Sequence, residues 1–216
     1  MSKQTATREL LIRAGVMPVV TVASVEQGLR IARALAAGGL SAIEITLRSA
    51  AALGAVRAIK AELPALAVGV GTVLNAAQVD RALEAGADFL VSPGTSPALA
   101  GVLADCPLPS IPGAATPSEI MALLELGFDC VKLFPAAALG GIARIKALAG
   151  PFPELALCPT GGIAEAEAAA YLAQPNVLCI GGSWMLQADW LAAERFDLIA
   201  ASAAAAHALA ASARRY

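Results

Sequence analysis

The sequence predicts an α/β protein, a single (β/α)8 TIM barrel over residues 1–216 with an extra N-terminal helix. Three observations support this fold class. Eight short apolar runs alternate with alanine-rich amphipathic stretches. A glycine that follows a helical stretch recurs before several of these runs. No shift in composition and no linker divides the chain, so one domain is expected.

The predicted elements follow one another in a regular order. Gln4–Ala14 has leucines at helical spacing and is predicted to be the leading helix, ended by Gly15. The predicted strands are Val16–Val22, Ser41–Thr46, Ala65–Val70, Asp88–Val91, Leu108–Ile111, Cys130–Phe134, Leu155–Cys158 and Val177–Ile180. The predicted later helices are Val25–Ala37, Ala50–Glu62, Ala76–Ala85, Pro97–Ala104, Pro117–Leu126, Gly141–Ala149, Glu165–Ala173, Ala188–Ala193 and Asp197–Ala213.

A weak internal repeat supports the count of strands. A helix end, a glycine and a strand start recur at residues 37–40, 84–88 and 125–129. Glycine adopts the left-handed conformation that commonly ends a helix, so these segments are predicted turns. The rival fold is a doubly wound open sheet, which uses fewer strands and usually carries a nucleotide loop near the first one. That loop is missing from the sequence there, so the barrel is favoured.

Composition restricts the classes of partner. Hydrophobic residues make up 58% of the chain, charged residues 15%, and the formal net charge is −2. This balance gives neither a basic footprint for nucleic acid nor a polybasic membrane patch. Met1–Leu10 lacks the apolar core of a secretory signal, and the apolar run Leu198–Ala211 is shorter than a membrane span. We expect a cytoplasmic protein that binds a small molecule.

The cysteines and the histidine argue against a metal site. Cys106, Cys130, Cys158 and Cys179 are widely spaced, contain no C-x-x-C pair, and accompany one histidine. Zinc sites need clustered ligands of these types. Reduced, buried cysteines are the simplest interpretation, and neither a metal nor a cofactor is expected.

One lysine lies in an apolar segment. Asp129–Gly141 has the pattern of a buried strand, ended by a proline and followed by a glycine-rich loop, with Lys132 inside the strand. The other lysines, Lys3, Lys60 and Lys146, lie in polar or helical segments. A desolvated ammonium tends to lose its proton, and an unprotonated amine attacks carbonyl groups. Lys132 is a candidate Schiff-base nucleophile. This stretch alone leaves a buried ion pair or a snorkelling lysine as alternatives.

The second predicted strand carries residues that would face this lysine. Side chains alternate along a strand, which places Ala42, Glu44, Thr46 and Arg48 on one side. Strands two and six lie opposite one another in an eight-stranded barrel, so Glu44 and Lys132 are expected to converge on its axis. A structural ion pair is the alternative, although such a pair does not need Arg48 at the strand end. The residues expected to pack outward are Ile43, Ile45, Leu47, Val131 and Leu133.

Glycine-rich turns follow several strands. The turn at residues 69–74 contains Thr72 and is explained equally well as a simple tight turn or as backbone that approaches a ligand. The turns at 92–94 and 111–113 contain Pro93 and Pro112, and they are interpreted first as strand ends and second as site walls. The segments at 159–163 and 180–184 are more specific. Each places a Gly-Gly pair beside a hydroxyl after strand seven or eight, where barrels commonly bind phosphate through backbone N–H groups. These two segments predict a phosphate site.

Together these motifs resemble a known family. They lie at residues 43–48, 71–73, 92–94, 131–136, 158–162 and 179–184, in one order and without large gaps. The chain resembles the bacterial 2-keto-3-deoxy-6-phosphogluconate (KDPG) aldolases, also called 4-hydroxy-2-oxoglutarate aldolases. The resemblance implies a metal-free class I aldolase, an aldehyde-lyase on a small TIM barrel, usually a homotrimer.

The resemblance also implies residue roles. Lys132 would form the Schiff base and Glu44 would be the general acid/base. The implied substrate-binding residues are Arg48, Thr72, Pro93, Phe134 and Thr160, and the implied phosphate-binding residues are Gly161, Gly162, Gly182 and Ser183. The chain departs from the family pattern at Ala137 and Leu139, where relatives commonly carry polar residues.

The expected reaction cleaves 2-dehydro-3-deoxy-6-phosphogluconate to pyruvate and glyceraldehyde 3-phosphate. A further candidate reaction cleaves 4-hydroxy-2-oxoglutarate to pyruvate and glyoxylate. Three alternatives stay open: an aldolase specific for the galactonate epimer, a metal-free sugar-phosphate isomerase or epimerase, and a phospholigand-binding barrel without catalysis.

Overall fold

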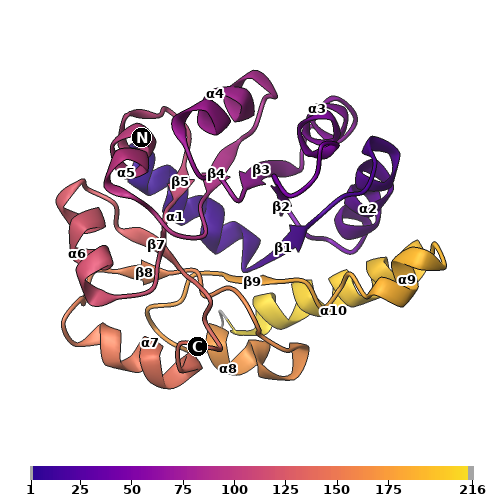
Figure 1. The fold of residues 1–216 in the computed structure, drawn as a ribbon. Coiled ribbons are helices and arrows are strands. Elements are labelled where there is room, and N and C mark those ends of the chain that lie inside the picture. The colour runs from indigo at the N-terminus through magenta and orange to yellow at the C-terminus, as the bar shows by residue number, and fades with distance from the viewer. Residues whose placement is uncertain (1, 214–216) are drawn as a thin grey trace.

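The computed structural model describes residues 2–213, and in it helices surround a central set of parallel strands (Figure 1). The strands are β1 Val16–Val20, β2 Ala42–Thr46, β3 Ala67–Gly71, β4 Phe89–Val91, β5 Ser110–Ile111, β6 Gly113–Ala114, β7 Cys130–Leu133, β8 Ala156–Leu157 and β9 Ile180–Gly182. The helices are α1 Lys3–Ala14, α2 Val25–Ala37, α3 Ala52–Glu62, α4 Ala76–Glu84, α5 Pro97–Asp105, α6 Pro117–Glu125, α7 Gly141–Ala149, the 3-10 turn η1 Glu165–Glu167, α8 Ala168–Leu172, α9 Ala188–Ala192 and α10 Phe196–Ala213.

The strands form two parallel sheets. The larger has the order β5-β4-β3-β2-β1-β9 and the smaller the order β6-β7-β8. At one seam, β5 and β6 are separated only by Pro112, whose carbonyl accepts a hydrogen bond of 2.9 Å from the amide of Lys132. At the other seam, isolated parallel bridges join Leu157 to Val177 and Thr160 to Gly181. Backbone hydrogen bonds thus connect the sheets near both edges.

The last predicted strand, Val177–Ile180, is wrong in its bounds, because β9 covers Ile180–Gly182. The two bridges explain the shift. Leu157 pairs with Val177, whereas Thr160 pairs with Gly181, so the later segment contains one extra residue between the bridges. An extra residue of this kind interrupts a strand ladder. The Gly-Gly pair at 181–182 therefore belongs to the strand and not to the turn after it.

Two other predicted elements are also corrected. Prolines at 107, 109 and 112 lack the N–H group that a ladder needs, and the expected strand Leu108–Ile111 is reduced to Ser110–Ile111. The helix expected at Glu165–Ala173 is divided into η1 and the five-residue α8.

Side chains from the strands enter two separate apolar clusters. Ile43 and Ile45 of β2 and Val131 and Leu133 of β7 join the cluster that packs against the helices. Ala42 and Cys130, from the other faces of the same strands, join a second, inner cluster. This division is what a period of two produces, and it confirms the predicted outward and inward rows.

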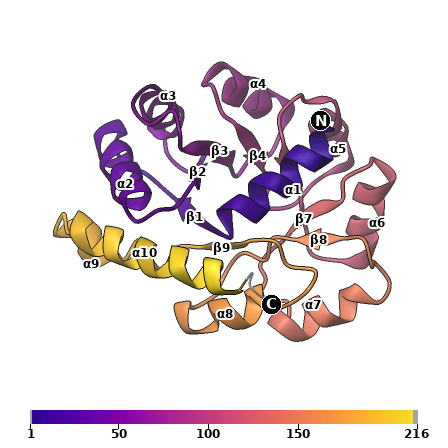
Figure 2. The ribbon, with the colours of Figure 1, turned by 180° about the vertical axis from the view of Figure 1, so that it is seen from behind.

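Helix α1 contributes to the inner cluster. Leu10, Leu11 and Ala14 are buried in it, and α1 runs across the strands when the molecule is seen from behind (Figure 2). Arg8 of α1 donates hydrogen bonds of 2.7 Å to the Asp129 carboxylate and 2.6 Å to the Glu154 carbonyl. The hydrogen bond with Asp129 raises the pKa of Arg8.

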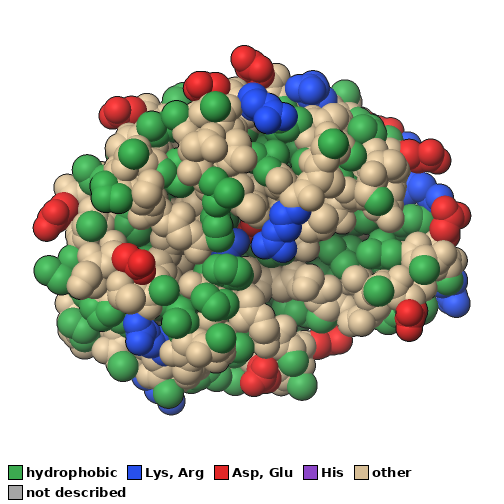
Figure 3. Space-filling model, in the orientation of Figure 1, with side chains coloured by type: hydrophobic (Ala, Val, Ile, Leu, Met, Phe, Trp, Pro, Cys, Tyr) green, Lys and Arg blue, Asp and Glu red, His purple; other side chains and the backbone are tan. Residues whose placement is uncertain are grey.

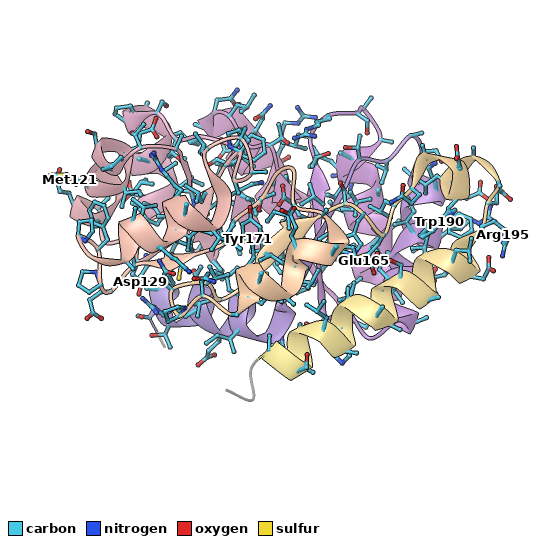
Figure 4. The ribbon with its side chains drawn as sticks, turned by 90° about the horizontal axis from the view of Figure 1, so that it is seen from below. Met121, Asp129, Glu165, Tyr171, Trp190 and Arg195 are labelled. Atoms are coloured by element: carbon cyan, nitrogen blue, oxygen red, sulfur yellow. The ribbon has the colours of Figure 1, made fainter. Side chains whose placement is uncertain are left out.

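Asp129 directly precedes β7, and it lies beside α1 (Figure 4). A second side chain of α1 is also anchored at a distance. The ammonium of Lys3 donates to the carbonyls of Leu103, Ala104 and Cys106 around the end of α5. Burial lowers the pKa of Lys3. The leading helix is thus fastened both to α5 and to the start of the strand that carries Lys132.

Helix α10 is long and apolar. Its 18 residues have a mean hydropathy of 1.4, which satisfies the length and composition of a membrane span, and 22% of it is buried. A single helix of this kind is weak evidence for a span. Its buried side packs against the end of α2, where a Cβ at Gly38 would lie 2.5 Å from the Cβ of Ala203. Close approach of α10 to α2 explains the glycine.

Helix α6 begins with a capping box. Thr116 accepts from the amide of Glu119 at 3.3 Å, and the Glu119 carboxylate accepts from the amides of Ala115 at 2.6 Å and Thr116 at 2.8 Å. These backbone donors, first that of Ala115, lower the pKa of Glu119 below its ordinary value of 4.5. The ionised carboxylate therefore stabilises the folded protein.

We expect Glu119→Gln to lower the free energy of unfolding by about 1 kcal/mol at pH 7, because a neutral amide is a weaker acceptor at a helix start. A lowered folded-state pKa stabilises above the unfolded value, and this contribution disappears as pH falls through the folded value. Urea unfolding of both proteins from pH 7 to pH 3 should show the difference shrinking below about pH 4.5. Glu125→Gln, at the other end of α6, is the control and should leave stability within about 0.5 kcal/mol. A pH-independent difference would contradict the assignment.

Candidate active site

The two charged residues predicted to converge do so. Lys132 Nζ of β7 lies 3.3 Å from Oε1 and 3.4 Å from Oε2 of Glu44 on β2. Each side chain is only 4% exposed. Both project to the inner side of their strands, because Ile43 and Val131 beside them pack outward. The structure therefore holds an amine and a carboxylate in a confined space with little water.

A cavity of about 410 Å³ opens beside this pair. Seven of the predicted site residues line it: Arg48, Phe134, Thr160, Gly161, Gly162, Gly182 and Ser183. Phe134 connects the cavity to the charged pair, since its ring centroid is 5.3 Å from Lys132 Nζ. Lys and Arg side chains lie at the centre of the face in Figure 3, where the surface is hollowed.

Two glycines shape the wall after β8. Gly161 and Gly162 have φ of +96° and +77°, a region that residues with a side chain rarely adopt. A Cβ at Gly161 would lie 3.0 Å from the Phe134 ring, and one at Gly162 would lie 2.8 Å from the Cβ of Ala137. Both glycines are therefore required by backbone conformation and by close packing against the loop after β7.

Thr160 follows β8 and links this segment to the loop after β7 and to β9. Its side chain is buried, its hydroxyl donates to the Cys158 carbonyl at 3.3 Å, and its own carbonyl accepts from the amide of Ala136 at 2.8 Å. Gly181, opposite Thr160 in the isolated bridge, leaves the space that the threonine side chain occupies. The loop after β7 and the segment after β8 are thereby joined at the cavity.

Comparisons with known proteins identify the family. The family described as "Aldolase: KDPG and KHG aldolase" matches residues 7–202. The chain belongs to the KDPG and KHG aldolase family. The "KHG/KDPG aldolase" of Escherichia coli (strain K12) is 44% identical over 196 residues, covering 91% of this chain and 92% of that protein. The "2-dehydro-3-deoxy-phosphogluconate aldolase" of Pseudomonas aeruginosa is 44% identical over 204 residues, covering 91% and 93%.

A solved structure of another family member is also similar. It is the KDPG aldolase from Legionella pneumophila "with pyruvate captured at low pH as a covalent carbinolamine intermediate". The two chains are 37% identical and superpose with a TM-score of 0.90, over 93% of this chain and 97% of the other. That aldolase forms a covalent bond between protein and pyruvate.

Four predicted site residues do not line the cavity: the charged pair Lys132 and Glu44, which lies beside it, and Thr72 and Pro93. Thr72 and Pro93 are absent from its walls and lie in the turns after β3 and β4. The turns are linked to neighbouring strands, because the amide of Val73 donates to the Val91 carbonyl at 3.1 Å and a Cβ at Gly113 would meet the carbonyl of Pro93. Their part in the site stays a prediction.

Five lining residues were not among the predicted site residues: Val19, Ile163, Ala164, Gly181 and Trp184. Trp184 is the most informative of them. Its ring occupies the space that a side chain at Gly182 would need, so the glycine allows the indole to pack against β9. The tryptophan that directly follows Gly-Gly-Ser was the available signal.

Buried thiols lie close to the charged pair. Cys158 follows β8, and its pKa is lowered by a hydrogen bond from Cys179 and by the positive charge of Lys132. Burial instead raises the pKa of Cys130. All four cysteines are buried and unbridged, as the sequence predicted.

Thr72 has an unusual backbone. Its φ of +59° lies in the left-handed region, which is strained for a β-branched residue. Strain of this kind costs about 1–3 kcal/mol and commonly marks a functional position. Thr72 is one of the residues predicted to bind substrate, and that role stays a prediction.

We expect Thr72→Gly to raise the KM for a 2-oxo acid about tenfold, the effect of one lost hydrogen bond to a charged group. The same change should leave thermal stability equal or higher, because glycine adopts positive φ without strain. Thr72→Ser, which keeps the hydroxyl, should retain a KM near that of the wild type. A glycine variant that is less stable but has normal KM would show that Thr72 is only structural.

Proposed function

We propose that this protein is a class I aldolase that cleaves 2-dehydro-3-deoxy-6-phosphogluconate to pyruvate and glyceraldehyde 3-phosphate. The observation that carries the proposal is the buried Lys132 amine, 3.3 Å from the Glu44 carboxylate and beside a cavity of about 410 Å³. Membership of the KDPG and KHG aldolase family supports it. Cleavage of 4-hydroxy-2-oxoglutarate to pyruvate and glyoxylate is proposed as a second activity, as the name of the Escherichia coli relative suggests.

The proposed mechanism begins with the amine. Unprotonated Lys132 Nζ attacks the C2 ketone to give a carbinolamine, which loses water to form an iminium ion. Glu44, directly or through a water, accepts the proton of the C4 hydroxyl as the C3–C4 bond breaks. The electron pair of that bond moves into the iminium, giving an enamine, and the C4 carbonyl leaves as the aldehyde. Glu44 then returns a proton to C3, and hydrolysis releases pyruvate and the free lysine.

The cavity suits a substrate with two anionic ends. Among the described residues that line it, Arg48 is the only charged one. A planar guanidinium matches a carboxylate with two parallel hydrogen bonds, so Arg48 and Thr72 are assigned to the carboxylate end. Gly161, Gly162, Gly182 and Ser183 are assigned to the phosphate, where backbone N–H groups can donate without an added cation. Phe134 and Thr160 form part of the cavity wall, and Pro93, in the turn after β4, is assigned to substrate binding outside that wall.

The wider organisation is also proposed. We take the strands as one closed (β/α)8 barrel with α1 as an extra helix, and the chain as a single domain. The hydrogen bonds across both seams support this assignment. A cytoplasmic location is proposed from the composition and the bacterial aldolase relatives.

A homotrimer is proposed from the resemblance noted in the sequence. Exposed apolar side chains on α4, on α6 and directly after α6 support self-association: Leu83 is 37% exposed, Met121 54% and Leu126 46%. Met121 lies at the outer edge of the molecule in Figure 4.

Incubation with pyruvate and borohydride should reduce the iminium to a stable adduct, detectable by intact mass and mapped to Lys132 by peptide analysis. Lys132→Met should form no adduct and cleave no substrate, because the nucleophile is gone. Lys146→Met is the matched control: it removes an exposed lysine of α7 and should keep both properties. A wild-type protein without an adduct would favour an isomerase, an epimerase or a non-catalytic barrel.

Substrate choice is tested by measuring pyruvate release from three acids: 2-dehydro-3-deoxy-6-phosphogluconate, its galactonate epimer and 4-hydroxy-2-oxoglutarate. We expect kcat/KM for the first to exceed that for the unphosphorylated acid by at least about tenfold, since binding at the distal phosphate adds to transition-state stabilisation. Equal values would remove the assigned role of the glycine loops. A higher value for the galactonate epimer would reassign the stereochemical preference.

A further inference from the structure

We propose that Gly71 is a positioning residue for Glu44: the absence of a side chain at position 71 provides the space that the Glu44 carboxylate occupies opposite Lys132. This inference rests on the proposed aldolase function, because it concerns the same charged pair. It differs from both roles considered for this segment in the sequence, a tight turn and a backbone that approaches a ligand.

The observation is a close approach inside the sheet. Gly71 is the last residue of β3 and lies next to Thr46 of β2 in the parallel register. The Glu44 side chain extends along the inner side of β2 toward this position. A Cβ on Gly71 would lie 2.5 Å from Cδ and Cγ of Glu44, and closer still to Oε1. In real structures a Cβ atom essentially never lies within 3.0 Å of a heavy atom outside its own residue and its two chain neighbours.

Backbone conformation does not account for this glycine. Gly71 is not among the residues with positive φ, and it is bonded in an ordinary strand ladder with β2. Alanine could adopt the same backbone, and a strand glycine is less favourable because it lacks a side chain to pack. The close contact with Glu44 is therefore the feature that a glycine uniquely permits at this position.

The Glu44 carboxylate is confined, and a side chain at position 71 would therefore change its position relative to Lys132. The carboxylate is 4% exposed, with Lys132 Nζ on one side and the backbone of β3 on the other. A Cβ at position 71 would force the carboxylate to rotate or to move by about half an ångström or more, out of its near-symmetric contact with the amine. Displacements of about 1 Å in a reacting group cost up to about 100-fold in rate.

The same strand offers a matched control. Gly69 lies two residues earlier, also faces the inner side, and pairs with Glu44 in the backbone register. A Cβ there would collide with the ring of Phe89, a fully buried residue of the inner apolar cluster, and not with a charged group. Gly69→Ala therefore introduces a comparable clash, in which the nearest atoms belong to Phe89 and to neither member of the pair.

The experiment compares Gly71→Ala with Gly69→Ala. For Gly71→Ala we expect kcat to fall about 100-fold while borohydride trapping of pyruvate on Lys132 persists, because the amine is intact and the displaced group is the acid/base. Exchange of the pyruvate methyl protons in deuterium oxide, followed by NMR, should fall in parallel with kcat. Gly69→Ala should lower the melting temperature yet keep kcat within about threefold of the wild type.

A second pair of variants separates the clash from a general effect on the strand. In a Glu44→Ala background the space is empty, so adding Gly71→Ala should change neither the melting temperature nor residual proton exchange. If Gly71→Ala alone does not fold, Glu44→Ala/Gly71→Ala should fold, because the collision is gone. Equal losses with and without the Glu44 side chain, or a near-normal kcat in Gly71→Ala, would overturn the inference. A wild-type protein that neither traps nor cleaves would instead refute the proposed function.

Discussion

The buried pair of Lys132 and Glu44 is the constraint on which the rest of the structure depends. Removing two opposite charges from water costs several kcal/mol for each ion, and a contact of 3.3–3.4 Å recovers this only in part. Apolar side chains of similar size would stabilise such a site at least as well. Stability alone therefore does not explain the pair. It requires a framework that keeps the amine and the carboxylate together despite their desolvation.

That framework is built by residues that do not line the cavity. Ile43 and Val131, each next to a member of the pair, are anchored in the outer apolar cluster, which fixes the direction in which Glu44 and Lys132 project. Helix α1 fills the inner space at the other end of the strands, and its Arg8 holds Asp129 at the start of β7. Rigid strands supported by packing hold a site more accurately than loops do.

The sequence allowed the pair to be predicted because two regular rules were enough. Alternation along a strand placed Glu44 and Lys132 on the inner side, and the symmetry of eight strands placed them opposite each other. The remaining features depend on irregularities that no period describes. The extra residue before Gly181 shifts β9, and the strained backbone of Thr72 has no signature in composition. Gly71 could not be recognised as a space for a carboxylate, because a glycine before a threonine equally indicates a turn.

The departure from the family pattern at Ala137 and Leu139 can now be interpreted in the same terms. The loop after β7 is held by its backbone: the amide of Ala137 donates to the Gly161 carbonyl at 3.0 Å. Leu139 packs against the outer cluster. Neither contact needs a polar side chain at these positions, and both secure the loop beside the glycine segment. Because the loop conformation is set by main-chain bonds and apolar packing, the position of Phe134 over Lys132 does not depend on the missing polar groups.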